Sequence, residues 1–262
     1  MSKVTINSST ADYSKYPNTN FDFDLPLIVK NCVSISMNSI IIPFSYNVIH
    51  DFNNKLYVDT NEGNGHTLVA EIKQGVYTNV DTFKDEVQQA INDALSASLP
   101  SSTDQFTVTY EAHPNYGGDH VNRIKIANGG VHQFKVLWSR SFRIAQMLGF
   151  RNKDDEYSNA VQAEYDINLT GADAIRVEFL PFALNTQSND GNTNYFQIPV
   201  NVNPGGTIIW ISQYDSDVFF NSLQNVHHIQ VRLVEADTLQ PLGGSLGINN
   251  PVFMSINFKA RT

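Results

Sequence analysis

Residues 33–38 read VSISMN, in which apolar residues alternate with small polar ones. This period of two predicts a β-strand with one covered face. The apolar run at residues 40–42 then fits either a strand covered on both faces or a shift of register at a bulge near Asn38 and Ser39. Pro43 would end the strand, because proline has no N–H to give to the ladder.

A similar alternation precedes this stretch, since phenylalanine and leucine alternate with aspartate at residues 21–25. It predicts a first strand at residues 21–29, divided from the next one by a polar break at Lys30 and Asn31. After residue 159 the pattern is again wholly of the β type. Six further strands are predicted there, at residues 163–169, 174–181, 195–202, 207–213, 226–235 and 252–258.

The segment at residues 75–99 predicts one long amphipathic helix, because its apolar residues recur at helical spacing. Thr78 and Asp81 resemble a capping box, and Pro100 would end the helix. The expected buried face consists of Phe83, Val87, Ala90, Ile91, Ala94 and Leu95.

Shorter elements surround this helix in the predicted structure. A second helix is expected at residues 141–148, closed by Gly149 in the left-handed conformation. Strands are expected at residues 56–58, 67–72, 106–110, 121–127 and 131–138.

The two kinds of pattern together predict an all-β protein, built as a single jelly-roll β-sandwich with an inserted small α/β domain that carries the long amphipathic helix. The jelly roll would comprise residues 21–49 plus 159–262, and the insertion domain residues 50–158. Residues 1–20 would form an N-terminal arm that orders against something else. Closing the sandwich would place the last strand, 252–258, beside the first, 21–29.

Composition narrows the functional classes. The net charge is −9, and no cluster of lysine and arginine occurs, which argues against nucleic-acid binding. No segment has the roughly 20 apolar residues of a membrane span, and the first ten residues lack the apolar core of a signal peptide. The single cysteine, Cys32, excludes an internal disulfide, favours a reducing compartment and is expected to be a small buried group. The sequons at Asn7 and Asn168 are then chance matches.

The histidines give no standard metal pattern. His113, Asp119 and His120 lie within one glycine-rich segment, but their spacing matches no zinc motif, and a solvated hairpin tip is the favoured interpretation. His227 and His228 are neighbours on a predicted strand, so their side chains would leave on opposite faces, with one of them buried and hydrogen-bonded.

The carboxylates give no catalytic pattern. Asp154, Asp155 and Glu156 form an acidic run that would need Asp166 or Asp173 to make a cation site, and their spacing is not that of a calcium loop. A second pair, Asp215 and Asp217, lies in a predicted turn, where aspartates usually bond their own backbone. We therefore predict no enzyme, no catalytic or cofactor-binding residue and no metal site.

Aromatic residues are dense in the C-terminal half, and a sugar-binding jelly roll would stack rings on such residues. The favoured alternative buries Phe196, Trp210 and Phe220 in the core and leaves Phe219 or Tyr214 at an interface. The aromatic residues concerned are Tyr195, Phe196, Trp210, Tyr214, Phe219 and Phe220.

The order of several segments along the chain resembles that of a known family. The segments are VTINSSTADYSKYPNTNFDFDLPLIV, SIIIPFSYNVI, GVYTNVDTFKDEVQQAINDAL, FRIAQMLGF, INLTGADAIRVEFLPF, FQIPVNVNPGG, IQVRLVEADTLQPL and VFMSINF. In this order they resemble the penton (minor capsid, vertex) proteins of virophages, Polintons and adintovirus-like viruses of the jelly-roll double-stranded DNA virus lineage. The chain departs from the family where QGVY stands in place of Pro-Gly-Tyr-Tyr before the helix, and where PFSY lacks the Trp that often follows the strand-ending proline.

The resemblance implies a structural capsid protein, assembled in the host cytoplasm and located at the virion vertices. Five copies would surround each fivefold axis, contact the neighbouring major capsid protein, and turn the insertion domain outward, where a receptor or spike role stays open. Two alternatives remain. One is a compact double jelly-roll capsid protein that forms trimers, and the other is a jelly-roll carbohydrate-binding or receptor-binding module.

Overall fold

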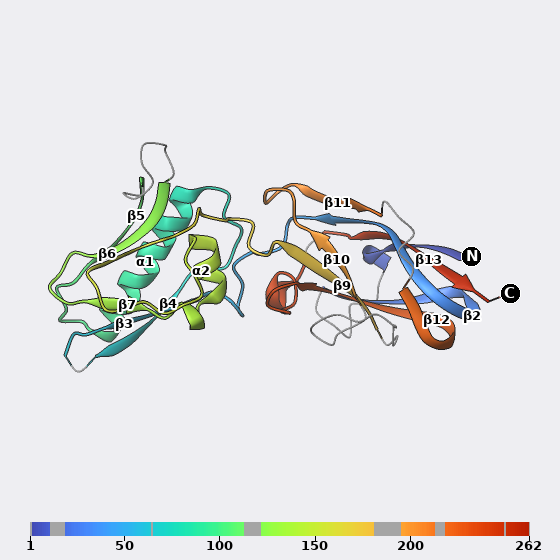
Figure 1. Cartoon of the computed structure of the whole chain (residues 1–262), viewed down its shortest axis with the longest axis horizontal. Helices are drawn as coiled ribbons and strands as arrows, with labels where there is room; N and C mark the ends of the chain where they lie inside the picture. The colour runs from blue at the N-terminus through green and yellow to red at the C-terminus, as the bar shows by residue number, and fades with distance from the viewer. Residues whose placement is uncertain are drawn as a thin grey trace. The chain divides into compact units, whose positions relative to one another are not determined.

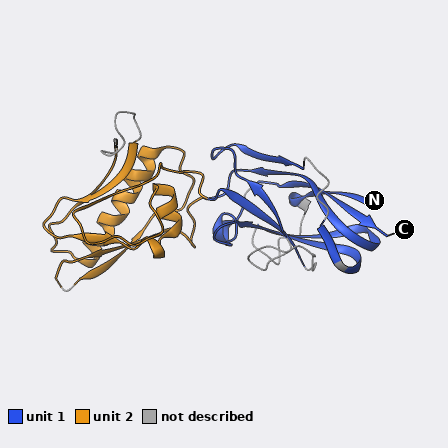
Figure 2. Cartoon of the chain, viewed as in Figure 1, with its two compact units in different colours: residues 1–47, 172–262 blue, residues 48–171 orange. Residues whose placement is uncertain are grey.

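The computed structural model describes residues 2–10, 19–63, 65–112, 122–180, 195–212, 218–248 and 250–261. The chain forms two compact units, coloured separately in Figure 2: unit 1 comprises residues 1–47 and 172–262, and unit 2 comprises residues 48–171. Unit 2 is therefore inserted into unit 1 between two segments of the same domain.

Unit 1 is a curled antiparallel sheet in which two strands belong to both layers. Residues 20–24 of β2 (Asn20–Pro43) pair with residues 228–232 of β12 (Val218–Glu235), and β9 (Ala174–Leu180) and β10 (Tyr195–Pro199) follow in that layer. The other half of β2 lies between β13 (Phe253–Ala260) and β11 (Thr207–Ile211) in the second layer. Figure 1 shows β2 and β12 bending between the two layers. The fold is mostly β and is that of a jelly roll, as predicted.

The closing of the sandwich differs from the prediction in two ways. The two expected strands at residues 21–29 and 33–42 form one strand, β2, which continues through Asn31 at a positive φ of 54°. The last strand, β13, pairs with residues 32–41 of β2 instead of residues 21–29, so that part of the prediction is wrong. The free side of β13 is taken by β1 (Ser2–Asn7), so the start of the predicted arm is a strand of this sheet.

A β-bulge at Asn38 explains the apolar run of residues 40–42. The pairing of β2 with β13 steps from Met37 opposite Ile256 to Ser39 opposite Ser255, which leaves Asn38 as the extra residue. Met37 and Ile40 therefore both point into the core although they are three positions apart. Of the two interpretations given by the sequence, the bulge is confirmed, and the side chain of Ile41 faces outward and is exposed.

Unit 2 packs one long helix against two small sheets. One sheet has the order β4 (His66–Glu71), β3 (Lys55–Thr60), β7 (Phe134–Val136), and the other has the order β5 (Phe106–Ala112), β6 (Asn122–Asn128), β8 (Ala160–Gln162). The helix α1 (Val80–Ser98) contacts β4 and β5. Its buried residues are Phe83, Val87, Ala90, Ile91 and Leu95, which confirms the predicted face except for half-buried Ala94.

Two asparagine side chains, one at the start of α1 and one within it, fix the helix in place. The N-cap is Asn79, whose side-chain oxygen accepts from the N–H of Asp81, so the predicted capping box at Thr78 is wrong by one residue. Further along the helix, Asn92 exchanges two hydrogen bonds with the backbone of Phe106 at 2.8 and 2.9 Å. This reciprocal pair attaches the helix to the start of β5.

The chain leaves unit 2 later than predicted, after residue 171 instead of residue 158. The reason is that residues 160–168 are hydrogen-bonded to the rest of unit 2. The strand β8 pairs with β6, and three of the backbone N–H groups that follow β8 donate to carbonyls of three different segments. The acceptors are the carbonyls of Ile124 for Ala163, Gly149 for Tyr165 and Met147 for Asn168. Residues 163–169 therefore form no strand, which corrects that prediction.

A short helix and three 3-10 turns complete the described structure. The helix α2 (Phe142–Leu148) ends at Gly149, whose φ is 83°, and the N–H of Phe150 bonds back to the carbonyl of Ala145, as the sequence predicted. The 3-10 turns are η1 (Ser8–Thr10), η2 (Trp138–Arg140) and η3 (Gly244–Leu246). Neither helix of the described residues has the length and apolar character needed to cross a bilayer.

Candidate functional site

The outer face of unit 1 carries an apolar row across three adjacent strands. Ile209 of β11 lies opposite Ile41 of β2, and Ile41 lies opposite Phe253 of β13 on its other side. All three side chains are exposed, Ile209 at 57%, and Ile211 on the same face of β11 is exposed at 66%. We call these four residues the outer-face patch.

The inner face of the same strands shows that the exposure is specific to one side. Ile42 and Ile208, which are also cross-strand partners, are fully buried, as are Ile40 and Met254. Because side chains alternate between the two faces of a strand, the sheet is apolar on both faces here. Contiguous exposed apolar residues on a folded sheet are typical of protein contact surfaces.

A second group of exposed apolar side chains lies on β2 and β12, beside the irregular part of their pairing. The register between these strands shifts between Phe219 and Gln224, between Gln224 and Val226, and between Val226 and His228. Four large apolar side chains are exposed around these shifts, namely Leu27, Ile28, Phe219 and Leu223. This group provides further apolar surface on unit 1.

The aromatic residues that the sequence analysis singled out divide between core and surface. Phe196 and Phe220 are buried, as predicted, and Phe219 is exposed. Trp210 is only half-buried, which corrects its assignment to the core. Half-buried Tyr195 has the guanidinium of Arg176 over its ring at 4.2 Å. Tyr214 lies outside the described residues.

The histidine candidates form no shared site in the described structure. His113, Asp119 and His120 lie outside the described residues. His227 is exposed, and His228 is half-buried with its Nδ1 at 3.0 Å from Oδ1 of Asp24. The expectation that one of this pair is buried is therefore wrong.

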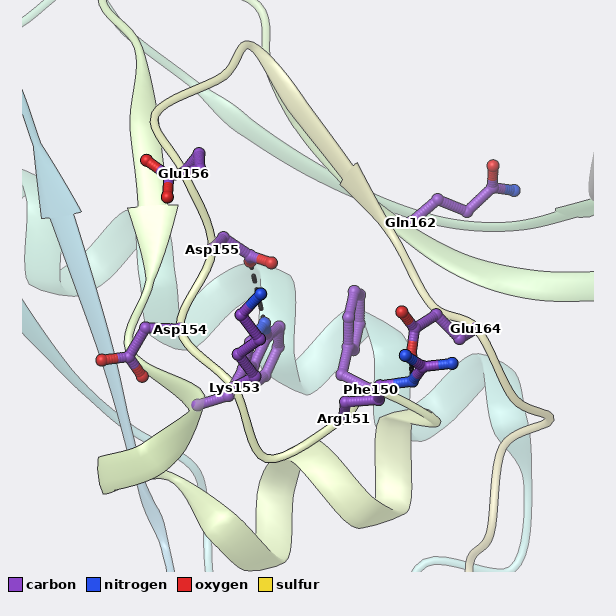
Figure 3. Close-up of a pocket in the computed structure, with 9 residues that line it drawn as sticks. Phe150, Arg151, Lys153, Asp154, Asp155, Glu156, Gln162 and Glu164 are labelled. Atoms are coloured by element: carbon purple, nitrogen blue, oxygen red, sulfur yellow. Dashed lines mark hydrogen bonds and ion pairs between the residues drawn. The ribbon is translucent and has the colours of Figure 1, made fainter.

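The acidic run lines a hollow of about 250 Å³ on unit 2, but its carboxylates point in different directions (Figure 3). Oδ1 of Asp154 accepts from the N–H of Ser139 at 2.8 Å, and Oδ2 of Asp155 accepts from Nε1 of Trp138 at 2.8 Å. Glu156 is exposed. The other residues that line the hollow are Phe150, Arg151, Lys153, Gln162 and Glu164.

The two carboxylates proposed to complete an acidic cation site lie elsewhere. Asp166 accepts from the hydroxyl of Tyr110 at 3.1 Å and lies 3.3 Å from Arg123, while Asp173 belongs to unit 1. Arg151 pairs with Glu164 at the rim of the hollow. The second predicted carboxylate pair, Asp215 and Asp217, lies outside the described residues.

The carboxylate of Asp155 has a displaced pKa. Burial raises its pKa above the usual 3.8, and hydrogen bonds with the side chain of Trp138 and the backbone of Val136 oppose that rise. Trp138 itself is buried and stacks on Phe150 with a centroid separation of 4.2 Å. Burial at this position therefore disfavours the charged form of the Asp155 carboxyl relative to the neutral form.

We expect Asp155→Asn to leave unit 2 at least as stable as the natural protein at pH 7, because an amide oxygen still accepts from Trp138 and carries no charge. A raised carboxyl pKa means that the folded state binds more protons, so the cost of the charge appears as pH rises from 3.8 through the folded-state pKa. The stability advantage of the variant should thus be absent in acid and grow towards neutral pH, as measured by urea unfolding across this range.

Exposed Glu156→Gln is the matched control, since it makes the same charge change one residue away and is not among the groups that act on Asp155. Its stability relative to the natural protein should not depend on pH in the same way. If Asp155→Asn were the less stable protein at neutral pH, the charged hydrogen bond to Trp138 would outweigh burial.

Two further observations concern reactive groups. Cys32 is fully buried, its thiol lies 3.4 Å from the carbonyl oxygen of Val29, and burial raises its pKa, so it is the small core residue that the sequence predicted. In unit 2, a cluster that sequence analysis missed brings Glu62, Asp104 and His132 together from three separate connections. A shallow hollow of about 290 Å³ lies beside Asp104 and the end of α1.

Comparison with known proteins finds proteins of similar structure but no match to a protein-family model or a curated sequence. Among solved structures, the selenomethionine-labelled mavirus penton protein is similar over the full length of both chains, with 11% sequence identity and a TM-score of 0.49. The 3.5 Å cryo-EM structure of the Sputnik virophage contains a chain that is similar over 98% of both chains, with 10% identity and a TM-score of 0.43. At these values the similarity assigns no role to any single residue of this chain.

Proposed function

We propose that this chain is a structural capsid protein, the pentameric penton subunit at the fivefold vertices of an icosahedral virion. Its partners are four further copies of itself and the neighbouring major capsid protein, and it is assembled in the host cytoplasm. The role is one of contact and not of catalysis. The order of sequence segments that resembles penton proteins and the jelly roll of unit 1 are consistent with this role.

The outer-face patch is the observation that carries the proposal. Ile41, Ile209 and Phe253 form a cross-strand row on the outside of a sheet whose inner face already fills the core. A neighbouring subunit would remove these side chains from water, with a gain of about 25 cal/mol for each Å² of apolar area. A ring of identical subunits uses one such surface against a different surface of the next copy, and five copies close the ring.

The shape of unit 2 favours the penton over the double jelly-roll alternative. A double jelly roll needs a second eight-stranded sandwich, about as large as the first. The described residues of unit 2 instead provide two three-stranded sheets and the 19-residue helix α1. Unit 2 is then an appended domain, and in this proposal it carries any contact with a host receptor or spike.

Native mass spectrometry of the purified full-length protein tests the proposal. We expect a species with the mass of five 29.3-kDa chains, and fivefold rings in electron micrographs of the same sample. A trimer would favour the double jelly-roll capsid protein instead. A stable monomer that binds sugars on a glycan array would favour the carbohydrate-binding module, with half-buried Trp210 as the ring to test.

A further inference from the structure

The cluster of Glu62, Asp104 and His132 has the geometry of a cation site. Nδ1 of His132 lies 3.1 Å from Oδ2 of Asp104 and 3.7 Å from Oε2 of Glu62. The three potential ligand atoms all lie within 4.8 Å of one another. They converge from the turn after β3, the connection between α1 and β5, and the connection between β6 and β7.

These separations match those of donor atoms around one tetrahedral ion. Zinc binds imidazole nitrogen and carboxylate oxygen at about 2.0 to 2.2 Å, which places neighbouring donors about 3.4 Å apart in a tetrahedral arrangement. The observed 3.1 and 3.7 Å lie on either side of that value. The two separations that involve His132 therefore differ from the tetrahedral value by only a few tenths of an ångström, and the two carboxylate oxygens lie within 4.8 Å of each other.

Neighbouring groups hold the two carboxylates in place. Asp104 accepts from Nδ2 of Asn128 at 2.7 Å and from the N–H of Val131 at 3.1 Å, and the hydroxyl of Ser102 donates to Oε2 of Glu62 at 2.6 Å. Hydrogen bonds of this kind orient the ligands of metal sites and raise their affinity. The site is therefore preorganised before any ion binds.

The close packing of Asp104 on Gly130 also holds this carboxylate in position. A Cβ at Gly130 would stand 1.8 Å from Oδ1 of Asp104 and 2.8 Å from its Cα, so no larger residue fits there without moving the carboxylate. The N–H of Gly130 bonds to the side chain of Asn128, the same residue that donates to Asp104. Asn128 and Gly130, where β6 leads into the connection to β7, therefore both pack on or bond around this carboxylate.

Burial and charge indicate which kind of ion would bind. The side chain of Asp104 is 1% exposed, that of Glu62 is 17% exposed and that of His132 is 32% exposed. Among the residues that the structure describes, the ion pairs of Glu62 and Asp104 are both with His132. A divalent cation with a neutral imidazole would balance both negative charges, and the exposed edge of His132 leaves room for entry and for a water ligand.

We propose that Glu62, Asp104 and His132 bind one divalent transition-metal ion, with zinc as the best match to one nitrogen and two oxygen ligands. The ion joins three connections of unit 2, because Glu62 and Asp104 are 42 positions apart in the sequence and Asp104 and His132 are 28 apart, and so it stabilises that unit. This inference concerns unit 2 alone and does not depend on the function proposed above.

The test is isothermal titration of the full-length, chelator-treated protein with zinc chloride. We expect one equivalent to bind with a micromolar or lower dissociation constant, and His132→Ala to weaken binding at least about 100-fold. Bound Co²⁺ should show the visible absorption of a four-coordinate ion. Zinc should also raise the unfolding temperature of the natural protein, whereas magnesium should not.

Two more variants make the result decisive. Ser102→Ala removes the donor to Glu62 and the acceptor of the Asp104 N–H, but no ligand atom. It should weaken zinc binding about 10-fold without unfolding the protein, which circular dichroism checks. His66→Ala removes an exposed histidine of the same unit that lies outside the cluster, and should change the affinity less than twofold. The proposal is wrong if zinc does not saturate the natural protein, or if His66→Ala weakens binding as much as His132→Ala.

Discussion

Ile209→Asp is expected to dissociate the proposed pentamer into folded monomers. Ile209 is 57% exposed in the single chain, so the substitution places a charge in water as long as the subunit is alone. In the proposed assembly, the same carboxylate would be removed from water within a row whose nearest members of the same subunit, Ile41 and Phe253, are apolar and offer it no hydrogen bond or counter-charge. We expect a loss of at least about 2 kcal/mol for each contact, which is about 30-fold in each association constant.

Leu246→Asp is the matched control for this experiment. Leu246 is 58% exposed and lies in η3 of the same unit, outside the sheet. The control should remain pentameric in native mass spectrometry, and both variants should keep the circular dichroism spectrum of the natural protein. A pentamer that survives Ile209→Asp unchanged would show that the outer-face patch faces solvent or a different protein in the particle.

The second large effect is expected at Gly149, where alanine should destabilise unit 2 by about 2 to 4 kcal/mol. The φ of 83° costs any L-residue about 1 kcal/mol. A Cβ at this position would also stand 2.3 Å from the carbonyl oxygen of Tyr165, and this backbone cannot move away because the N–H of Tyr165 bonds to the carbonyl of Gly149. Urea unfolding of the full-length protein measures the change.

Gly65→Ala separates the two contributions. The φ of Gly65 is 84°, almost the same as that of Gly149, but the nearest atom to an added Cβ is 3.7 Å away. This control should therefore lose only about 1 kcal/mol, the cost of the backbone conformation alone. Equal losses in the two variants would mean that the connection at residues 163–169 yields to the added methyl group.

The elements that the sequence predicted best are those whose signal is local. The buried face of α1 follows from apolar residues at helical spacing, and Gly149 follows a short helix at the position where the left-handed conformation ends it. The bulge at Asn38 was one of two interpretations, because a run of three isoleucines cannot show by itself which of them turns inward. The pairing with β13 decided it.

The errors concern pairings between residues far apart in the sequence. Residues 163–169 alternate like a strand, yet their amides bond to Ile124, Gly149 and Met147 in place of one partner strand. The polar break at Lys30 and Asn31 suggested two strands, but Asn31 takes a positive φ and its N–H bonds to the side chain of Asn225, so β2 continues. Such partners are not visible in the local pattern.

The cluster in unit 2 was missed for the same reason. Metal motifs are recognised when two ligands stand a few residues apart on one element, whereas Glu62, Asp104 and His132 each come from a different connection. The residues that the sequence offered instead, Asp154 to Glu156, are adjacent but turn towards Ser139, Trp138 and solvent. Spacing along the chain was a poor guide to distance in this domain.

The passage of β2 and β12 through both layers has a mechanical consequence for unit 1. When two separate sheets face each other, force on one can shear it from the other by breaking only side-chain contacts. Here β2 and β12 each take part in both layers. Sliding one layer over the other would therefore break the backbone hydrogen bonds that pair β2 with β12, β11 and β13. Unit 1 should therefore unfold cooperatively under force, without an intermediate in which one layer has separated from the other.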